Sequence, residues 1–103
     1  MSDSSVSKHY ERIFLSKIEI SPEVIFQEIS GETVILDLKS ESYFGLDTTG
    51  TRIWELLQEN QAPIDIVRIM SSEFDVDPDI LKRDLAEHID SLEKAELITL
   101  IEQ

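Results

Sequence analysis

The chain has 103 residues, enough for one small domain with a modest hydrophobic core and too few for two. Its 22 acidic and 9 basic residues give a formal net charge of −13, which disfavours nucleic acid and suits a basic partner or plain solubility. It has no cysteine, no apolar stretch long enough to cross a bilayer, and no signal-peptide segment at its start. We therefore expect a cytoplasmic protein with neither a membrane nor a nucleic-acid partner.

The first part of the chain changes character near residue 13. Residues 1–12 are polar and serine-rich, which predicts a disordered N-terminal tail followed by a single domain over residues 13–103. Residues 13–20 alternate weakly between apolar and polar, so they fit either an extra edge strand or an arm that exchanges between protomers.

Short apolar segments separated by turns predict an antiparallel meander of three strands. The segments span residues 24–30, 33–38 and 42–46, with turns at 31–32 and 39–41. In the second of them Val34, Leu36 and Leu38 recur at every other position and so share one face of the sheet.

Helical periodicity replaces this pattern after Leu46. The first helix has N-cap candidates at 47–49 and ends near 58–60, the second starts at Pro63, and the third starts at Pro78 behind the N-cap residue Asp77. Their apolar positions are Ile53, Trp54 and Leu57; Ile66, Val67, Met70 and Phe74; and Leu81, Leu85, Ile89 and Leu92. Residues 97–101 are too apolar to stay in water and should pack back on the core. The predicted fold class is α+β, with a three-stranded antiparallel sheet followed by three helices.

The segment DVDPD at residues 75–79 begins like a calcium-binding loop. Such a loop needs glycine at its sixth position and glutamate at its twelfth, where this chain has Ile80 and Ala86. Helix capping explains these carboxylates better. Two histidines without cysteine cannot build a structural zinc site, so we expect no metal and no cofactor.

No pattern of side chains predicts catalysis. The serines lie in turns and in the tail, no nucleophile motif is present, and the three glycines form no phosphate-binding loop. His88 falls inside the apolar arc of the third helix, where it fits a packed side chain at the core boundary, or alternatively the lining of a binding groove.

Two groups of aromatic residues remain. Trp54 lies beside Ile53 and three positions before Leu57, which is typical of a residue that anchors a helix to a sheet. Tyr43 and Phe44 point to opposite faces of their strand, so one can enter the core while the other faces a groove. Gly45 follows them and would let another backbone approach closely.

These segments resemble a known family. The runs VILDLKSESYFGLDTTGTRIWELL and DLAEHIDSLEKAELI are similar to the PqqD-like family, the recognition elements of ribosomally made, post-translationally modified peptides. The resemblance runs from about residue 20 to residue 98 and is strongest to stand-alone elements of lasso-peptide systems. Asp47 stands where the family usually has asparagine, and Ala62 stands where threonine or serine would cap the second helix.

The resemblance implies a winged-helix-like domain that is not an enzyme. It implies that the leader segment of a precursor peptide adds as a strand beside residues 42–47 and lies against the third helix, and that a separate modifying enzyme or leader peptidase then acts on the peptide. The peptide-binding residues expected on this basis are Ser42, Tyr43, Phe44, Gly45, Leu46, Asp47, Leu81, Asp84, Leu85 and His88.

Two other functions stay open at this point. A winged-helix regulator would use the third helix to read DNA, but Lys82, Arg83 and Lys94 are outnumbered there by acidic residues. A homodimeric accessory module without leader binding, formed by exchange of residues 13–20, is the remaining alternative.

Overall fold

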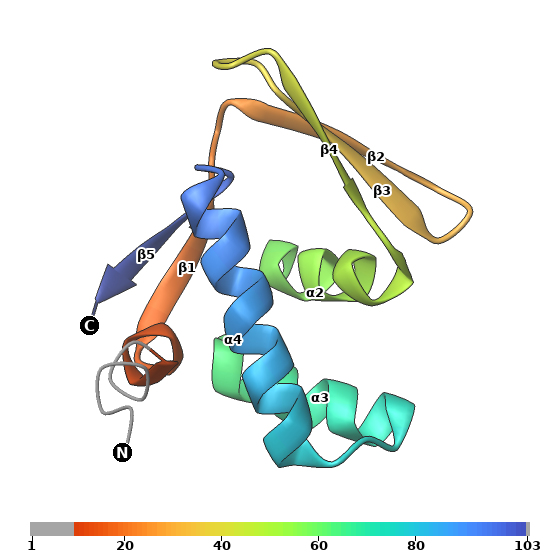
Figure 1. The fold of residues 1–103 in the computed structure, drawn as a ribbon, viewed down its shortest axis with the longest axis vertical. Coiled ribbons are helices and arrows are strands. Elements are labelled where there is room, and N and C mark those ends of the chain that lie inside the picture. Colours follow the sequence, from red (N-terminus) through yellow and green to blue (C-terminus); the bar gives the residue numbers. More distant parts are fainter. Residues whose placement is uncertain (1–9, 103) are drawn as a thin grey trace.

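The computed structural model describes residues 10–102 and contains two small sheets and three helices that follow the larger sheet (Figure 1). In chain order the elements are β1 (Ser16–Ile20), β2 (Val24–Ile29), β3 (Glu32–Asp37), β4 (Ser42–Leu46), α2 (Thr48–Gln58), α3 (Pro63–Phe74), α4 (Pro78–Lys94) and β5 (Ile98–Glu102). The predicted α+β class is confirmed.

The larger sheet is an antiparallel meander in the order β2-β3-β4, as predicted. Its first turn consists of Ser30 and Gly31, both with positive φ (53° and 82°), between the paired residues Ile29 and Glu32. Two left-handed residues in a two-residue loop match the natural twist of a hairpin. The turn therefore lies one residue earlier than the Gly31-Glu32 pair predicted from the sequence.

The two faces of this sheet differ in burial. Val34 and Leu36 share a face, as expected, but that face is turned outward and Val34 is 42% exposed. The opposite face packs on α2: Ile35 is fully buried, and the hydroxyl groups of Thr33 and Thr51 form a buried hydrogen bond of 2.8 Å. Alternation alone could not tell which of the two faces meets the helix.

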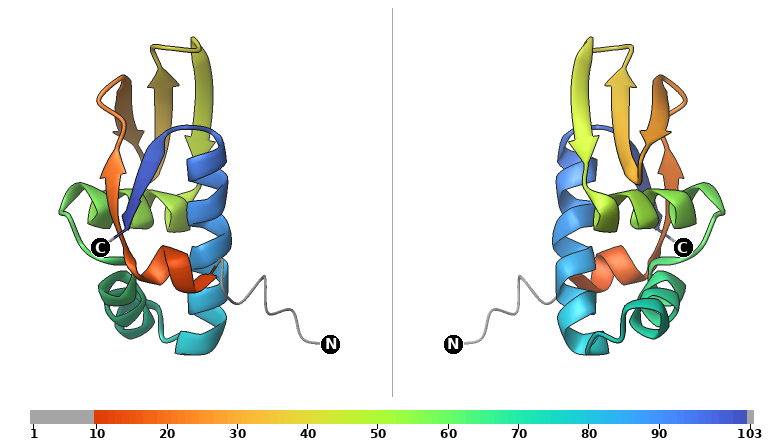
Figure 2. Two further views of the ribbon diagram at one scale, coloured as in Figure 1. Left: turned by 90° about the vertical axis from the view of Figure 1, so that its left-hand side faces the viewer. Right: turned by 90° about the vertical axis from the view of Figure 1, so that its right-hand side faces the viewer.

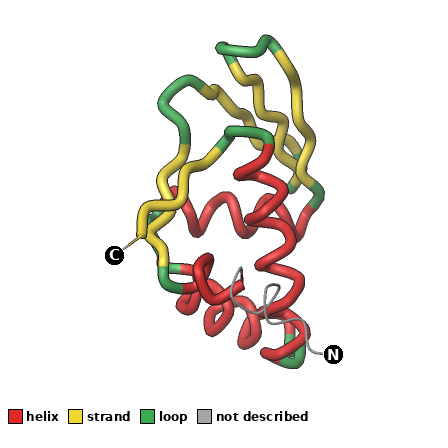
Figure 3. Tube along the Cα trace, turned by 60° about the vertical axis from the view of Figure 1, so that its left-hand side comes forward, coloured by secondary structure: helices red, strands yellow, loops and turns green. Residues whose placement is uncertain are grey.

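The second sheet pairs β1 with β5 and joins the two ends of the described chain (Figure 3). Residues 16–20 therefore form an edge strand. Residues 97–101 pack back on the core, and most of them belong to β5, the strand that pairs with β1. Residues 10–14 are helical, and Arg12 forms ion pairs with Glu93 (3.2 Å) and Glu102 (3.1 Å). The packed part of the chain thus includes residues 10–12 of the expected tail, while residues 1–9 lie outside the described residues.

Each helix begins as its sequence predicts. The Asp47 carboxylate accepts the N–H of Gly50 at 2.8 Å, and the Asp77 carboxylate accepts the N–H of Asp79 at 2.9 Å. Ala62 makes no side-chain cap, and Pro63 follows it at the first helical position. Helix capping therefore accounts for Asp77, one of the carboxylates in the calcium-like segment.

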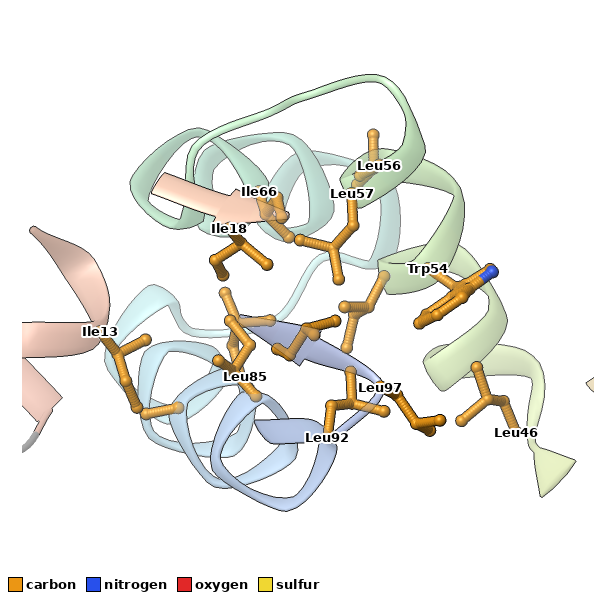
Figure 4. Packing of buried hydrophobic residues seen from close by; sticks show 14 of the residues in the cluster. Ile13, Ile18, Leu46, Trp54, Leu56, Leu57, Ile66, Leu85, Leu92 and Leu97 are labelled. Atoms are coloured by element: carbon orange, nitrogen blue, oxygen red, sulfur yellow. The ribbon is translucent and has the colours of Figure 1, made fainter. Parts of the chain in front are cut away.

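The core lies between the helices and the β1–β5 pair, with Trp54, Leu57, Leu85 and Leu97 among its buried side chains (Figure 4). Trp54 is 1% exposed, which confirms its predicted role as a core anchor. The three-stranded sheet extends from one end of this helical body, so its outer strands are not enclosed by helices (Figures 1 and 2).

Candidate functional site

β4 is an open edge of the three-stranded sheet. Among the described residues no strand pairs with its outer side, and Figure 2 shows it as the outermost strand on the side where α4 rises. Its sequence, SYFGL, contains neither lysine nor proline, the residues that commonly block pairing at an edge. An extended chain could therefore add to β4.

The residues of β3 bond alternately toward β2 and toward β4. One backbone hydrogen bond at the end of the strand shows which residues bond in each direction. The N–H of Leu38 donates to the carbonyl oxygen of Glu23 at 2.8 Å, so these residues form a hydrogen-bonded pair between the β3 and β2 sides of the hairpin. In an antiparallel ladder such pairs alternate. Two residues back, Leu36 also bonds toward β2, and Ile35 bonds toward β4.

The same alternation identifies the free groups of β4. Ile35 is opposite Phe44, so Phe44 uses its N–H and C=O to bond with β3. The backbone groups of its neighbours, Tyr43 and Gly45, therefore point away from the sheet, where they are free to pair with another chain. These two residues supply the main-chain donors and acceptors of the candidate site.

The β4 side chains provide surfaces on both sides of this edge. Tyr43 is 71% exposed on the outer face, and Phe44 is half-buried and packs against the core from the inner face. A Cβ placed on Gly45 would have no heavy atom within 4 Å. Ser42 is exposed, whereas Leu46 is buried. The outer side of β4 is thus unobstructed at its centre.

At the lower end of β4 the strand, α2 and α4 meet around Gly50. A Cβ on Gly50 would lie 3.2 Å from Cε1 of His88, 3.3 Å from Cβ of Leu46 and 3.4 Å from Oδ1 of Asp47. Leu46, Asp47 and His88, which were predicted separately as site residues, are therefore brought together at one junction. Gly50 itself was missed from the sequence, although a poor helix former three residues after an N-cap is a signal of close approach.

His88 is half-buried, and its Nε2 atom is buried without a hydrogen-bond partner in the described structure. Burial lowers the pKa of His88, and the nearby Asp47 carboxylate opposes that shift. The imidazole is therefore neutral at pH 7, because its ordinary pKa is already below 7.

The other predicted residues of α4 separate into two groups. Leu81 and Leu85 are buried in the hydrophobic core, and Asp84 is exposed on the helix surface. Of the four residues predicted on α4, His88 is the one whose side chain reaches the junction at the end of β4. Contact of these residues with a peptide stays a prediction.

Other kinds of site find little support in the described part of the chain. Over residues 10–102 no group of three or more His, Cys, Asp or Glu side chains is placed to hold a metal ion, and none of the helices is long and apolar enough to span a membrane. Surface hollows found among these residues are lined by segments other than β4; one of them, of about 640 Å³, lies along α3 beside Val76 and Pro78. The open edge of β4 is an extended surface rather than an enclosed pocket.

Comparison with known proteins gave one family and two solved structures. A family model described as "Coenzyme PQQ synthesis protein D (PqqD)" matches residues 32–98, and no curated protein matched. The structure described as "TbiB1 in Complex with the TbiA(beta) Leader Peptide" is 40% identical, with a TM-score of 0.76 over 78% of this chain and 93% of that chain. The structure described as "Lasso peptide synthetase B1 complexed with the leader peptide" is 25% identical, with a TM-score of 0.75 over 81% of this chain and 98% of that chain.

Proposed function

This chain belongs to the coenzyme PQQ synthesis protein D (PqqD) family, and on that premise we propose that it binds the leader segment of a ribosomally made precursor peptide along the open edge of β4. The observation that carries the proposal is the free edge itself, with the backbone groups of Tyr43 and Gly45 directed outward. A peptide added there would gain main-chain hydrogen bonds for affinity and side-chain contacts for specificity.

The two similar structures support this assignment because both are complexes with leader peptides, and this chain matches nearly the whole length of each. At 40% identity, the first has enough sequence in common for its peptide to serve as a probe of this chain. We expect the TbiA(beta) leader peptide to bind, with an affinity below that of the natural leader.

The energetics of strand addition are favourable only if apolar anchors contribute. Ordering a flexible peptide costs about 2–5 kcal/mol or more, whereas micromolar to nanomolar affinity needs roughly −8 to −12 kcal/mol overall. Main-chain hydrogen bonds to two residues cannot both offset the ordering cost and supply this binding free energy, because each contributes about 1 kcal/mol net. Side chains of the peptide must therefore pack beside Tyr43 on one face or Phe44 on the other.

We further propose that the protein carries the bound peptide to a separate modifying enzyme or leader peptidase and is not itself a catalyst. Its net charge of −13 would speed the capture of a basic leader or partner and make that rate fall with added salt. A cytoplasmic location fits a chain without cysteine. The homodimer considered from the sequence is not required for this function.

DNA binding is disfavoured by the charge of α4. Within its bounds α4 has three basic residues and five acidic ones. The basic residues are Lys82, Arg83 and Lys94, and the acidic residues are Asp79, Asp84, Glu87, Asp90 and Glu93. A helix with this excess of negative charge would be repelled by the phosphates that line a DNA groove.

Amide hydrogen exchange with and without the TbiA(beta) leader peptide tests the proposal. In the free protein the N–H groups of Phe44 and Leu46 are bonded to β3 and should exchange slowly, whereas those of Tyr43 and Gly45 should exchange fast. Peptide binding should slow Tyr43 and Gly45 selectively. Unchanged exchange at both residues with a peptide that binds elsewhere would contradict strand addition to β4.

The β2 edge provides an internal control for this experiment. By the same alternation the N–H groups of Phe26 and Glu28 point outward from β2. They should exchange fast with and without peptide. Slowing at both edges alike would indicate general stabilisation of the protein instead of pairing at β4.

A further inference from the structure

Gly50 lies where three other residues converge. A Cβ at this position would lie 3.2 Å from Cε1 of His88, closer than all but a small fraction of Cβ contacts, and only slightly farther from Leu46 and Asp47. Gly50 does not have a positive φ, so its backbone conformation does not require glycine. Alanine would favour the helix more. Close approach of the His88 ring therefore explains the glycine.

This contact connects α4 with the start of α2, directly after the end of β4. Gly50 follows the end of β4 by four residues and is held there by the Asp47 cap, whose carboxylate accepts its N–H at 2.8 Å. His88 belongs to α4. The ring-to-glycine contact thus limits how closely α4 can approach the end of β4.

We propose that the Gly50–His88 contact is a positioning device that sets the gap between β4 and α4 in which the leader peptide docks. The inference rests on the proposed function and adds to it two positioning residues, of which Gly50 was not among the predicted site residues. The width of the gap would then depend on the size of the His88 ring and on the missing Cβ of Gly50.

The device also depends on the charge of the imidazole. Its Nε2 atom is buried and makes no hydrogen bond within the described residues, and burial lowers the pKa of the ring. Asp47 is the charged group that meets the ring from the β4–α2 junction, and Asp84 and Glu87 are exposed acids on the same helix. Protonation would place a charge in a contact that is built for a neutral ring, and the acids would offset part of the cost.

A size-compensation experiment tests the geometry. We would measure the affinity of the TbiA(beta) leader peptide by calorimetry for the wild type, Gly50→Ala, His88→Ala and the double variant. Gly50→Ala adds a methyl group that displaces the ring, and His88→Ala leaves space, so each should weaken binding by about tenfold, a loss of roughly 1.4 kcal/mol. The double variant should bind more tightly than Gly50→Ala alone, because it removes the shortest of the three close contacts of the added methyl group.

Thr49→Ala is the matched control, since Thr49 is exposed in the same helical turn and should leave the affinity unchanged. If the wild type does not bind the peptide, the proposed function fails and this inference fails with it. If the wild type binds and Gly50→Ala binds equally well, the inference alone is overturned. Equal affinities of the double variant and Gly50→Ala would overturn it as well.

The pH profile gives a second readout that does not depend on the folding of Gly50→Ala. His88→Phe keeps a ring in the contact and cannot titrate. Below about pH 6.5, the ordinary pKa of histidine, the affinity of the wild type should fall more steeply than that of His88→Phe. Parallel profiles for the two proteins would show that His88 does not control the gap and would overturn the inference.

Discussion

Among the described residues the three-stranded sheet has two open edges, β2 and β4. Of these two strands, β4 leads into the Gly50 junction with α4. Both strands are short, and neither contains lysine or proline. β2 turns directly into β3, and its inner side chains reach α2, where the rings of Phe26 and Trp54 lie 5.5 Å apart edge to face. β4 runs into α2, whose first turn contacts His88 of α4. An open edge is therefore a generic feature, and the helix beside the end of β4 is what makes that edge a candidate site.

Truncation of Trp54 tests the structural role of the β2 side and has the largest expected effect. Trp54→Ala removes a ring that is 1% exposed and contacts Phe26, so the free energy of unfolding should fall by about 3–5 kcal/mol. Urea unfolding followed by circular dichroism measures the change. A variant as stable as the wild type would show that Trp54 does not anchor α2 to the sheet.

Proline scanning separates the two edges directly. Gly45→Pro removes an outward N–H of β4 without breaking a bond to β3, and its ring obstructs the approach of another strand. The fold should survive, and the affinity for the TbiA(beta) leader peptide should fall by at least about tenfold, since one main-chain bond contributes about 1 kcal/mol and the ring adds a steric cost.

The matched variant on the other edge is Glu28→Pro, which removes an outward N–H of β2 at an exposed position. Its affinity for the peptide should equal that of the wild type. If Glu28→Pro weakened binding as much as Gly45→Pro, the peptide would not distinguish the two edges, and the choice of β4 would be wrong.

The two faces of β4 can be compared in the same assay. Tyr43 is exposed, so Tyr43→Ala should leave stability within about 0.5 kcal/mol and weaken peptide binding by up to about fivefold, the usual range for a cross-strand pair. Phe44 packs partly against the core, so Phe44→Ala should lower stability measurably as well. Wild-type affinity in both folded variants would contradict pairing at β4.

Much of this arrangement follows from local sequence signals. Turn residues, alternation and helix caps predict the meander and all three helices after it, because each of these features depends on neighbouring residues. The pairing of β1 with β5 was not predicted, since it joins Ser16 to Glu102 across nearly the whole chain. The outward face of Val34 was not predicted either, because a period of two marks the faces of a strand without telling which one is buried.

The candidate site divides in the same way. The backbone edge at Tyr43 and Gly45 could be predicted from a strand with no visible partner. The rotation of α4 could not, and the structure places Leu85 in the core while His88 reaches Gly50. That rotation depends on how the helix packs against α3 and β5, which no single segment specifies.

The smallest expected effect concerns how β2 is held on α2. Glu28 shares a hydrogen bond with Glu55, and this, with some burial, raises the pKa of Glu28 above its ordinary value of 4.5. The folded protein therefore binds this proton more tightly than the unfolded chain, so the pair stabilises the fold at pH values below 4.5, and this contribution is lost as the pH rises through the raised pKa. Charge repulsion from Glu55 is a further cause of the raised pKa of Glu28, and it disfavours the deprotonated Glu28 carboxylate at higher pH. Glu28→Gln should then raise the urea midpoint slightly at pH 7 and make the decline of the midpoint between about pH 4.5 and 7 less steep. A lower midpoint at pH 7 would show that Glu28 and Glu55 do not repel each other.

Since Glu28 lies on the edge that we do not expect to bind the peptide, the same variant should leave leader affinity unchanged. Glu28→Gln therefore tests both the stability of the fold and the difference between the two edges.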